Sequence, residues 1–207
     1  EANTLREDIV GAGGKAELLQ ADIRIPEGLE RLREELEGEA VDIVVFNAIG
    51  GIDLRPVLEQ GMSSFEEAFD YGVRAPVTIL SAALPGMVER RHGRIISILS
   101  AAVLGPPPPH FSSYLVNKYS LMALTKSVAV EYGKHGICAN MVSPGMLRTG
   151  LMAHLSERVM KVYEAQTPAR RLAEIVEVAD AVVFLSGPQA SYINGHNLVV
   201  SGGSVMV

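Results

Sequence analysis

The sequence predicts a doubly wound α/β domain, in which helices cover both faces of one parallel sheet. Apolar, β-branched runs of strand length alternate along the chain with longer segments of helical periodicity, and this alternation is typical of βαβ units. Two of the runs, VDIVVFN and RIISILS, are apolar enough to be buried strands. The chain has 207 residues, enough for one sizeable core, so residues 1–207 are expected to form a single domain.

The first part of the chain is predicted to contain two helices and two strands. A helix over Leu5–Ala12 ends at a pair of glycines, and a short strand follows over Ala16–Ala21. Pro26 then begins a charged helix that continues to Glu37, because proline is favoured in a first helical turn. Val41–Asn47 is predicted to be a strand that is buried on both faces.

The middle of the chain is predicted to be a long helical region, a second buried strand and a rigid loop. The helical region covers Ser63–Arg91, in which Pro76 and Pro85 are the places for a kink or a helix end. The strand covers Arg94–Ser100. The loop Gly105–His110 is stiffened by four successive prolines.

The last part of the chain is predicted to alternate in the same way. Ser112–Gly133 has a helical apolar pattern, with Ser112 or Ser113 as the N-cap, since serine side chains accept hydrogen bonds from a first helical turn. Thr149–Gln166 is interpreted as a helical lid or a loop. The remaining predicted elements are a strand over Ile137–Val142, a helix over Val176–Ser186 and a last strand over Asn197–Val200.

The composition is typical of a small acidic enzyme of the cytoplasm. A net charge of −6 argues against nucleic acid or an anionic membrane as the main partner. Cys138 is the single cysteine, so it forms no internal disulfide and is interpreted as a small buried hydrophobe. The five histidines lack ligand spacing, so no metal is proposed. No apolar run reaches the roughly 18 residues of a membrane span, and the N-terminus does not resemble a signal peptide.

Ser100, Tyr114 and Lys118 form the strongest candidate active site. Ser100 ends a predicted strand, and Tyr114 and Lys118 share one face of the next helix because they are four residues apart. A neighbouring ammonium is expected to lower the pKa of the phenol from about 10, so that Tyr114 exchanges a proton with a carbonyl or alcohol oxygen. Ser100 would hydrogen-bond that oxygen, and Lys118 would also donate to ribose hydroxyls of a nucleotide. A Tyr-x-x-x-Lys pair alone is weak evidence, and its order and setting give it weight.

Five segments resemble successive blocks of the classical short-chain dehydrogenase/reductase family, in the family's order. They are VDIVVFNAIGG, GRIISILSAA, SYLVNKYSLMALTKSVAVEYG, GICANMVSPGMLRTGL and ADAVVFLSGPQASYINGHNLVVSGG. The resemblance covers Ala16 to Gly203 and is greatest to the 3-oxoacyl-carrier-protein reductases. It implies a Rossmann-like, three-layer α/β/α fold, with Ser100, Tyr114 and Lys118 as catalytic residues. It also implies hydride transfer between NAD or NADP and a small carbonyl or alcohol, by a homodimer or homotetramer.

The resemblance further implies which residues bind the cofactor, beside Tyr114 and Lys118. They are Asp22 and Ile23 near the adenine, Asn47 and Ala48 at the next strand end, and Pro144, Gly145, Leu147 and Thr149 in the loop that receives the nicotinamide carboxamide. Each match has a simpler alternative. Asp22 would then only turn the chain before Pro26, Asn47 would be an ordinary strand-end residue, and Pro144 would only end a strand.

The sequence departs from the family pattern in three places. No glycine-rich phosphate turn follows a first strand, and Gly11–Gly14 is interpreted as a helix end rather than as that turn. Gly72 stands where the family has an asparagine that takes part in a proton relay. Ile49 replaces a glycine beside the cofactor, which would weaken binding unless Gly50 provides the close approach.

The missing glycine-rich turn changes the expected arrangement of strands in the sheet. With a strand order of 3-2-1-4-5-6, Ala16–Ala21 and Val41–Asn47 would lie about 14 Å apart with no strand between them. We therefore expect a strand-helix-strand segment, the first two strands of the fold, to be absent from the given sequence. The alternative is a naturally shortened chain whose gap is filled by rearrangement or by a partner.

Two further function classes stay open at this point. The departures at Ile49 and Gly72 and the absent turn are compatible with a non-redox relative, such as a cyclase, dehydratase or isomerase, that no longer binds the dinucleotide. A non-catalytic binding or assembly module is the third class. The substrate pocket is expected between Pro106–His110 and Gly150–Gln166, whereas the choice between NAD and NADP and the identity of the substrate are not readable.

Overall fold

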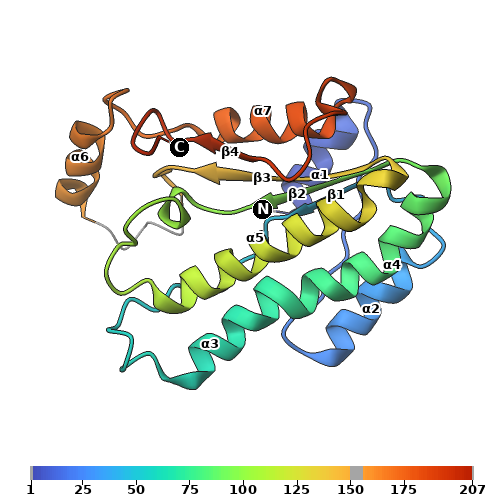
Figure 1. The fold of residues 1–207 in the computed structure, drawn as a ribbon, viewed down its shortest axis with the longest axis horizontal. Coiled ribbons are helices and arrows are strands. Elements are labelled where there is room, and N and C mark those ends of the chain that lie inside the picture. Colours follow the sequence, from blue (N-terminus) through green and yellow to red (C-terminus); the bar gives the residue numbers. More distant parts are fainter. Residues whose placement is uncertain (1, 150–155, 207) are drawn as a thin grey trace.

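The structure is a computed structural model that describes residues 2–149 and 156–206. Its centre is a parallel sheet (Figure 1), in which four strands follow one another in chain order. The strands are β1 (Ile43–Phe46), β2 (Gly93–Ile98), β3 (Ile137–Pro144) and β4 (Asn197–Val200). The predicted parallel α/β sheet is therefore confirmed, and β4 has the predicted bounds.

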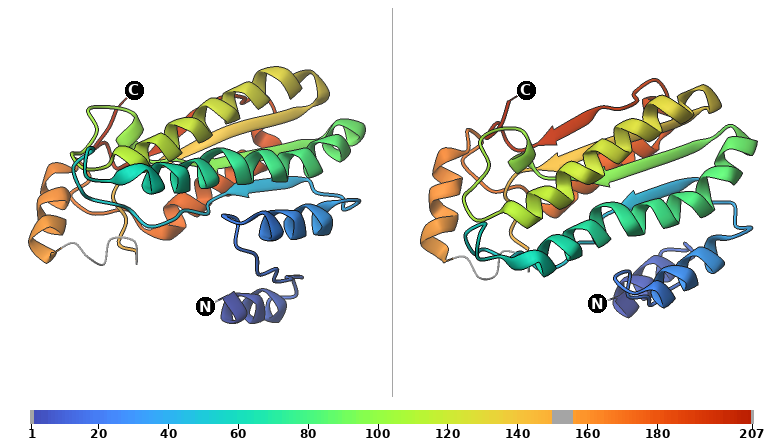
Figure 2. Two further views of the ribbon diagram at one scale, coloured as in Figure 1. Left: turned by 90° about the horizontal axis from the view of Figure 1, so that it is seen from below. Right: turned by 60° about the horizontal axis from the view of Figure 1, so that its bottom comes forward.

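Helices cover both faces of the sheet, as predicted. On one face lie α4 (Ala75–Arg90) and α5 (Ser112–Tyr132), and α2 (Pro26–Leu36) packs against α4. The other face is covered by α7 (Ile175–Ser186), which contacts β2, β3 and β4. The two further views separate these layers (Figure 2).

Two hydrophobic clusters hold the layers together. The larger cluster joins β1, β2 and β3 to α4 and α5, and its members Ile95 and Met141 are at most 1% exposed. The smaller cluster joins the other face of the sheet to α7 through Ile96, Val142 and Leu185. Successive side chains of a strand point to opposite faces, so β2 and β3 are buried on both. This explains why their sequences are apolar almost without interruption.

The long helical region before β2 is interrupted once. α3 (Gly61–Phe69) leads through a π-helical turn, Asp70–Arg74, directly into α4. Pro76 has no N–H to give to the preceding turn, and the helix widens just upstream of it. Pro85 lies inside α4 and does not end it. The predicted interruption is thus confirmed near Pro76 only.

Two sequence-based expectations about the sheet are wrong. Residues 16–21 form no strand; this segment is instead held to α2 by Arg31, whose Nη1 donates to the Gln20 carbonyl at 3.1 Å. β1 is therefore an edge strand among the described residues, and it is buried on one face only. Ile43 is 47% exposed and Val45 is 44% exposed, because α7 covers β2 to β4 and does not extend over β1.

The predicted N-cap of α5 is also wrong. Phe111 occupies the cap position, and its side chain makes no capping hydrogen bond. The backbone N–H of Ser113 donates instead to Oε1 of Gln60, at 3.0 Å, from a segment 53 residues earlier in the chain. A tertiary contact has therefore replaced the local cap that the two serines predicted.

The peripheral elements agree with the sequence. α1 (Ala2–Gly11) lies apart from the main body (Figure 2) and contains no buried residue. α6 (Glu157–Gln166) occupies most of the predicted lid, whose residues 150–155 lie outside the described part of the chain. Cys138 is buried, as predicted. No helix in the described ranges is long and apolar enough to cross a membrane.

Candidate active site

The carboxyl ends of the parallel strands bring the predicted site residues to one edge of the sheet. Asn47 follows β1, Ser100 follows β2 after one residue, and Gly145 follows β3 directly. The register β1–β2–β3 is parallel throughout, so these ends meet on the same side. In open α/β sheets, ligands bind outside this edge.

Ser100 is placed by a sharp change from strand to 3-10 helix. Its extended backbone, with φ −162° and ψ 147°, begins the short helix Ala101–Val103, and its Oγ accepts from the N–H of Ala102 at 3.2 Å. The same side chain lies close enough to the phenol of Tyr114 to act on its pKa. The hydroxyls of Ser100 and Tyr114 therefore lie together, where both can reach one substrate oxygen.

Tyr114 and Lys118 project from the first two turns of α5, as their spacing predicts. The ammonium of Lys118 lies 5.7 Å from the centre of the Tyr114 ring. Its Nζ donates to the carbonyl of Ile98 at 2.9 Å, which ties the catalytic helix to the end of β2. Phe111 packs edge-on against Tyr114, with the ring centres 5.6 Å apart.

Burial, rather than charge, determines the acid–base properties of this pair. Desolvation raises the pKa of Tyr114, and the neighbouring Ser100 side chain only partly opposes this. Desolvation also lowers the pKa of Lys118 from 10.5 to about 8, because the side chain is 3% exposed. The expectation that Lys118 lowers the pKa of the phenol is therefore wrong for this arrangement, in which Tyr114 is protonated at neutral pH.

The residues matched to the nicotinamide side lie at or after the carboxyl ends of β1 and β3. Asn47 and Ala48 are exposed at the end of β1, and Pro144 is buried at the end of β3. The N–H of Gly145 donates to the Val200 carbonyl at 2.9 Å, and a Cβ on Gly145 would lie 3.1 Å from Cα of Ser201. Farther along this loop, the N–H of Thr149 donates to the Leu147 carbonyl at 3.1 Å.

The residues matched to the adenine side lie in a turn before α2. Asp22 accepts from Arg24 Nη2 at 2.8 Å, and this contact lowers the pKa of Asp22 to about 2. Arg24 also reaches Glu67, with 3.9 Å between Nη1 and Oε1. Glu67 and Tyr114 line one small cavity, so this turn adjoins the candidate site. Ile23 belongs to the same turn and is partly buried.

Gly72 occupies the middle of the π-helical turn and leaves no room for a side chain. A Cβ at this position would lie 2.3 Å from Oγ of Ser120 and 2.8 Å from the Asn117 carbonyl, because α5 passes directly over it. Asn117, next to Lys118, is buried, and its Nδ2 donates to the Ala68 carbonyl at 3.2 Å. An amide therefore does lie against this turn, but it comes from α5.

The two glycine segments that the sequence relates to cofactor binding, Gly11–Gly14 and Gly50, behave differently. Gly13 has φ +85°, and the N–H of Gly14 donates to the Ile9 carbonyl at 2.9 Å, which is the geometry of a helix end. Gly11–Gly14 therefore closes α1, as predicted, and does not cradle a phosphate. A Cβ on Gly50 would lie 2.5 Å from Oε1 of Glu67, so Gly50 allows a close approach to α3.

The fit of a nicotinamide cofactor is therefore uneven along its length. At the nicotinamide end, the Lys118 ammonium has donors left after its bond to Ile98. In residues 2–149 and 156–206, no strand leads through a short glycine-rich turn into a helix, which is the usual pyrophosphate site. The residues present fit the nicotinamide and its ribose.

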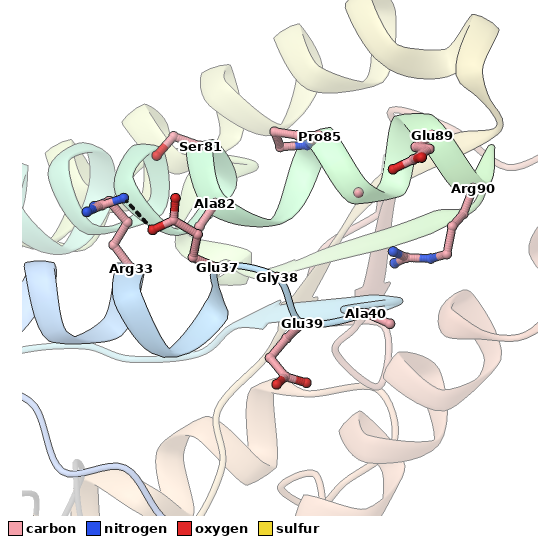
Figure 3. A pocket seen from close by; sticks show the side chains of 11 residues that line it. Arg33, Glu37, Gly38, Glu39, Ala40, Ser81, Ala82, Pro85, Glu89 and Arg90 are labelled. Carbon is pink, nitrogen blue, oxygen red and sulfur yellow. Dashed lines mark hydrogen bonds and ion pairs between the residues drawn. The ribbon is translucent and has the colours of Figure 1, made fainter.

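A second hollow lies at the opposite, amino end of the sheet (Figure 3). It has a volume of about 410 Å³ and lies between the end of α2 and the side of α4. Both of its arginines already have partners: Arg33 pairs with Glu37 at 2.9 Å, and Arg90 donates to the Val41 carbonyl at 2.6 Å. None of the predicted site residues lines it, so we do not assign it a function.

Sequence reasoning missed two buried amides beside the site, Gln60 and Asn117. Each is isolated in its sequence context, and no motif singles either out. Each binds at least one backbone group 49 to 53 residues away. A helix-capping signal was visible, but it pointed to Ser112 and Ser113 rather than to Gln60.

Comparisons of the chain with a family model and with known sequences both indicate that it is related to reductases. A family model described as enoyl-(acyl carrier protein) reductase matches residues 2–205. The chain is 33% identical to the 3-oxoacyl-(acyl-carrier-protein) reductase FabG of Escherichia coli (strain K12), covering 97% of this chain and 81% of FabG.

Solved structures agree with this. A short chain dehydrogenase/reductase family protein is 33% identical, with a TM-score of 0.84, over 98% of this chain and 82% of that protein. A putative NAD(P) dependent gluconate 5-dehydrogenase from Beutenbergia cavernae, with bound NADP, is 28% identical. Its TM-score is 0.90, over 97% of this chain and 81% of that one.

Proposed function

The chain belongs to the short-chain dehydrogenase/reductase family of NAD(P)-dependent oxidoreductases and is similar to its 3-oxoacyl-(acyl-carrier-protein) reductases. From this premise, we propose that it reduces a small carbonyl compound, or oxidises the corresponding alcohol, at Ser100, Tyr114 and Lys118. The observation that carries the proposal is that the Ser100 and Tyr114 side chains lie close together beside the buried ammonium of Lys118.

Each side chain has a separate task in this proposal. The neutral phenol of Tyr114 donates a proton to the carbonyl oxygen as negative charge develops there, and the raised pKa keeps that proton available at neutral pH. Ser100 donates a hydrogen bond to the same oxygen. Lys118, fixed by the Ile98 carbonyl, stabilises the phenolate left behind and donates to ribose hydroxyls.

The cofactor is proposed to be NAD or NADP, which supplies or accepts the hydride when bound. Asn47, Ala48, Pro144 and Gly145 would surround the nicotinamide, with Leu147 and Thr149 in the adjoining loop. Asp22 and Ile23 would contact the adenine. The named relatives are reductases and dehydrogenases, one of them with NADP bound, so no observation favours the non-redox alternative.

A homodimer or homotetramer is proposed from the outer surface of α5. Val116, Tyr119 and Val130 are 43%, 46% and 83% exposed, and their spacing places apolar groups along the side of α5 that faces away from the sheet. A second copy would cover such a stripe. We also propose a cytoplasmic location, from the acidic composition and the single, unpaired cysteine.

Tyr114→Phe tests the proposed chemistry, because it removes one oxygen and keeps the ring that packs on Phe111. We expect NADPH- or NADH-dependent reduction of a 3-oxo ester such as ethyl acetoacetate to fall at least about 1,000-fold, the loss of a general acid together with its aligned hydrogen bonds. The melting temperature should change little.

The matched control is Tyr132→Phe, which changes the same atom at the far end of α5. It should keep wild-type rates. A Tyr114→Phe protein with more than a tenth of wild-type activity would contradict the assignment of the acid.

A further inference from the structure

Gln60 is fully buried although residues 55–59 and 61 are exposed. Its Nε2 lies 2.8 Å from the Arg55 carbonyl, 3.0 Å from the Asp53 carbonyl and 3.2 Å from the His110 carbonyl. Its Oε1 accepts from the N–H of Ser113 at 3.0 Å. One side chain therefore joins its own loop, the proline-rich loop and the start of α5.

The three segments that meet at Gln60 all border the candidate active site. The loop that contains Asp53 and Arg55 continues from the end of β1, where Asn47 lies. The proline-rich loop ends at His110 and is the expected wall of the substrate pocket. Ser113 directly precedes Tyr114. Gln60 thus connects the proposed cofactor side, the proposed substrate side and the helix that carries the acid.

The chemistry of these contacts requires an amide. Backbone carbonyls need a donor and a helix N–H needs an acceptor, and a primary amide presents both in one planar group. His110 has φ +67°, an unusual conformation for a residue other than glycine, and its carbonyl is one of the groups that Gln60 holds. α5 has no side-chain cap from Phe111, so Gln60 supplies the acceptor that a local cap would have supplied.

We propose that Gln60 is a positioning residue for the reaction: it fixes the first turn of α5 against both loops and thereby sets where the Tyr114 hydroxyl meets Ser100. Its side chain touches neither hydroxyl. This inference rests on the proposed function of Tyr114. The effect should be on turnover more than on cofactor affinity, because small errors in the alignment of reacting groups reduce rates strongly.

Two substitutions test it, with hydrogen exchange at the Ser113 amide as a readout that does not need turnover. Gln60→Met keeps the length of the side chain and removes its hydrogen bonds. We expect kcat for NADPH-dependent reduction of ethyl acetoacetate to fall about 10- to 100-fold, with less than a three-fold change in KM for NADPH. The Ser113 amide should exchange at least about ten-fold faster, since its acceptor is gone.

Gln60→Glu gives a pH signature that loss of stability alone would not produce. Burial among three carbonyl oxygens raises the pKa of the new carboxyl. Its neutral form still donates one hydrogen bond and accepts from Ser113, whereas its ionised form only accepts. The ratio of its kcat to that of wild type should therefore rise at least five-fold from pH 8 to pH 6. Gln189→Glu, on an exposed residue, is the control and should give a flat ratio.

Each result of these experiments either supports or overturns the proposed role of Gln60. Wild-type kcat and Ser113 exchange in Gln60→Met would overturn the proposal, and so would a flat ratio for Gln60→Glu, which would leave Gln60 a merely structural role. If Gln60→Met does not fold, the Gln60→Glu ratio decides alone. If the wild-type protein turns over neither NADPH nor NADH, the proposed function fails. Faster exchange of the Ser113 amide in Gln60→Met than in wild type, measured at one pH, would then still support the contact between Gln60 and α5.

Discussion

The strands β2 and β3 with helix α5 differ sharply from the first 36 residues of the chain. In the former, Ile95, Met141 and Val142 are almost fully inaccessible, and even Lys118 is 3% exposed. In the latter, α1 has no buried residue and α2 buries only Gly28 and Leu29. The residues that we propose for catalysis are thus fixed to the best-packed part of the molecule.

The two regions are also held by different forces. The central region is held by apolar contacts and by hydrogen bonds between distant segments, such as Ser97 Oγ with Thr125 Oγ1 at 2.7 Å. The N-terminal region packs on the rest of the molecule mainly through α2 against α4, and its ion pairs are exposed and local, such as Arg33 with Glu30 within α2. Such pairs contribute little to stability in water. We infer that the side of the site that contains Ser100, Tyr114 and Lys118 is rigid because it belongs to the well-packed centre. The turn at Asp22, on the proposed adenine side, belongs to the weakly held region.

The largest effect on stability is expected from a truncation in the centre of the sheet. Ile95→Ala removes a side chain that is 1% exposed in the larger cluster, and should lower the free energy of unfolding by about 2–5 kcal/mol. Ile43→Ala is the matched control on β1, where the same side chain is 47% exposed. Urea denaturation should show that Ile43→Ala lowers the free energy of unfolding by less than about 1 kcal/mol. Equal losses for the two variants would contradict the contrast between the centre of the sheet and its edge.

An intermediate effect is expected from the buried ammonium. Lys118 has a folded pKa of about 8, below its ordinary value of 10.5, so between these values the unfolded chain binds more protons. Its contribution to stability is therefore greatest above pH 10.5 and is lost as pH falls to 8. From pH 8 to pH 9.5, the free energy of unfolding should rise by about 1–2 kcal/mol. Lys118→Met should remove this rise in stability with pH. The same rise in the variant would show that another group causes it.

The smallest effect is expected in α1. Leu5 is 61% exposed, so Leu5→Ala should change the free energy of unfolding by less than about 0.5 kcal/mol. Leu121→Ala, in α5 at 3% exposure, should cost about 2–5 kcal/mol in the same denaturation experiment. A substantial loss from Leu5→Ala would mean that α1 has packing partners that its exposure does not indicate.

Much of the fold and the central site was predictable, because the signals were local. The apolar runs gave β2, β3 and β4, and the spacing of Tyr114 and Lys118 placed both on one face of α5. What failed depended on partners distant in sequence. Among the described residues, Ala16–Ala21 has strand-like composition but no strand beside it, and α7 packs mainly on β2 to β4, which leaves the second face of β1 exposed.

The same distinction explains the errors within the site. The spacing of Tyr114 and Lys118 indicates their proximity, but not the burial that raises the pKa of Tyr114. A serine before a helix suggests a cap, but whether Gln60 displaces it depends on how a loop folds back 53 residues away. Gly72 suggested a lost polar group, while the amide of Asn117 lies against the same turn.

The order of strands in the sheet has a consequence for how fast the molecule reaches its native state. Every ladder joins segments that are about 45–55 residues apart, as in Ile43 with Arg94, Gly93 with Ile137 and Met141 with Asn197. No hairpin among the described residues can start the sheet, so a large loop must close before each strand pairing forms, and three must close to complete the sheet. Chains dominated by such non-local contacts fold in milliseconds to seconds rather than microseconds. Until then, the apolar strands stay open to association with other chains, which makes folding yield dependent on protein concentration.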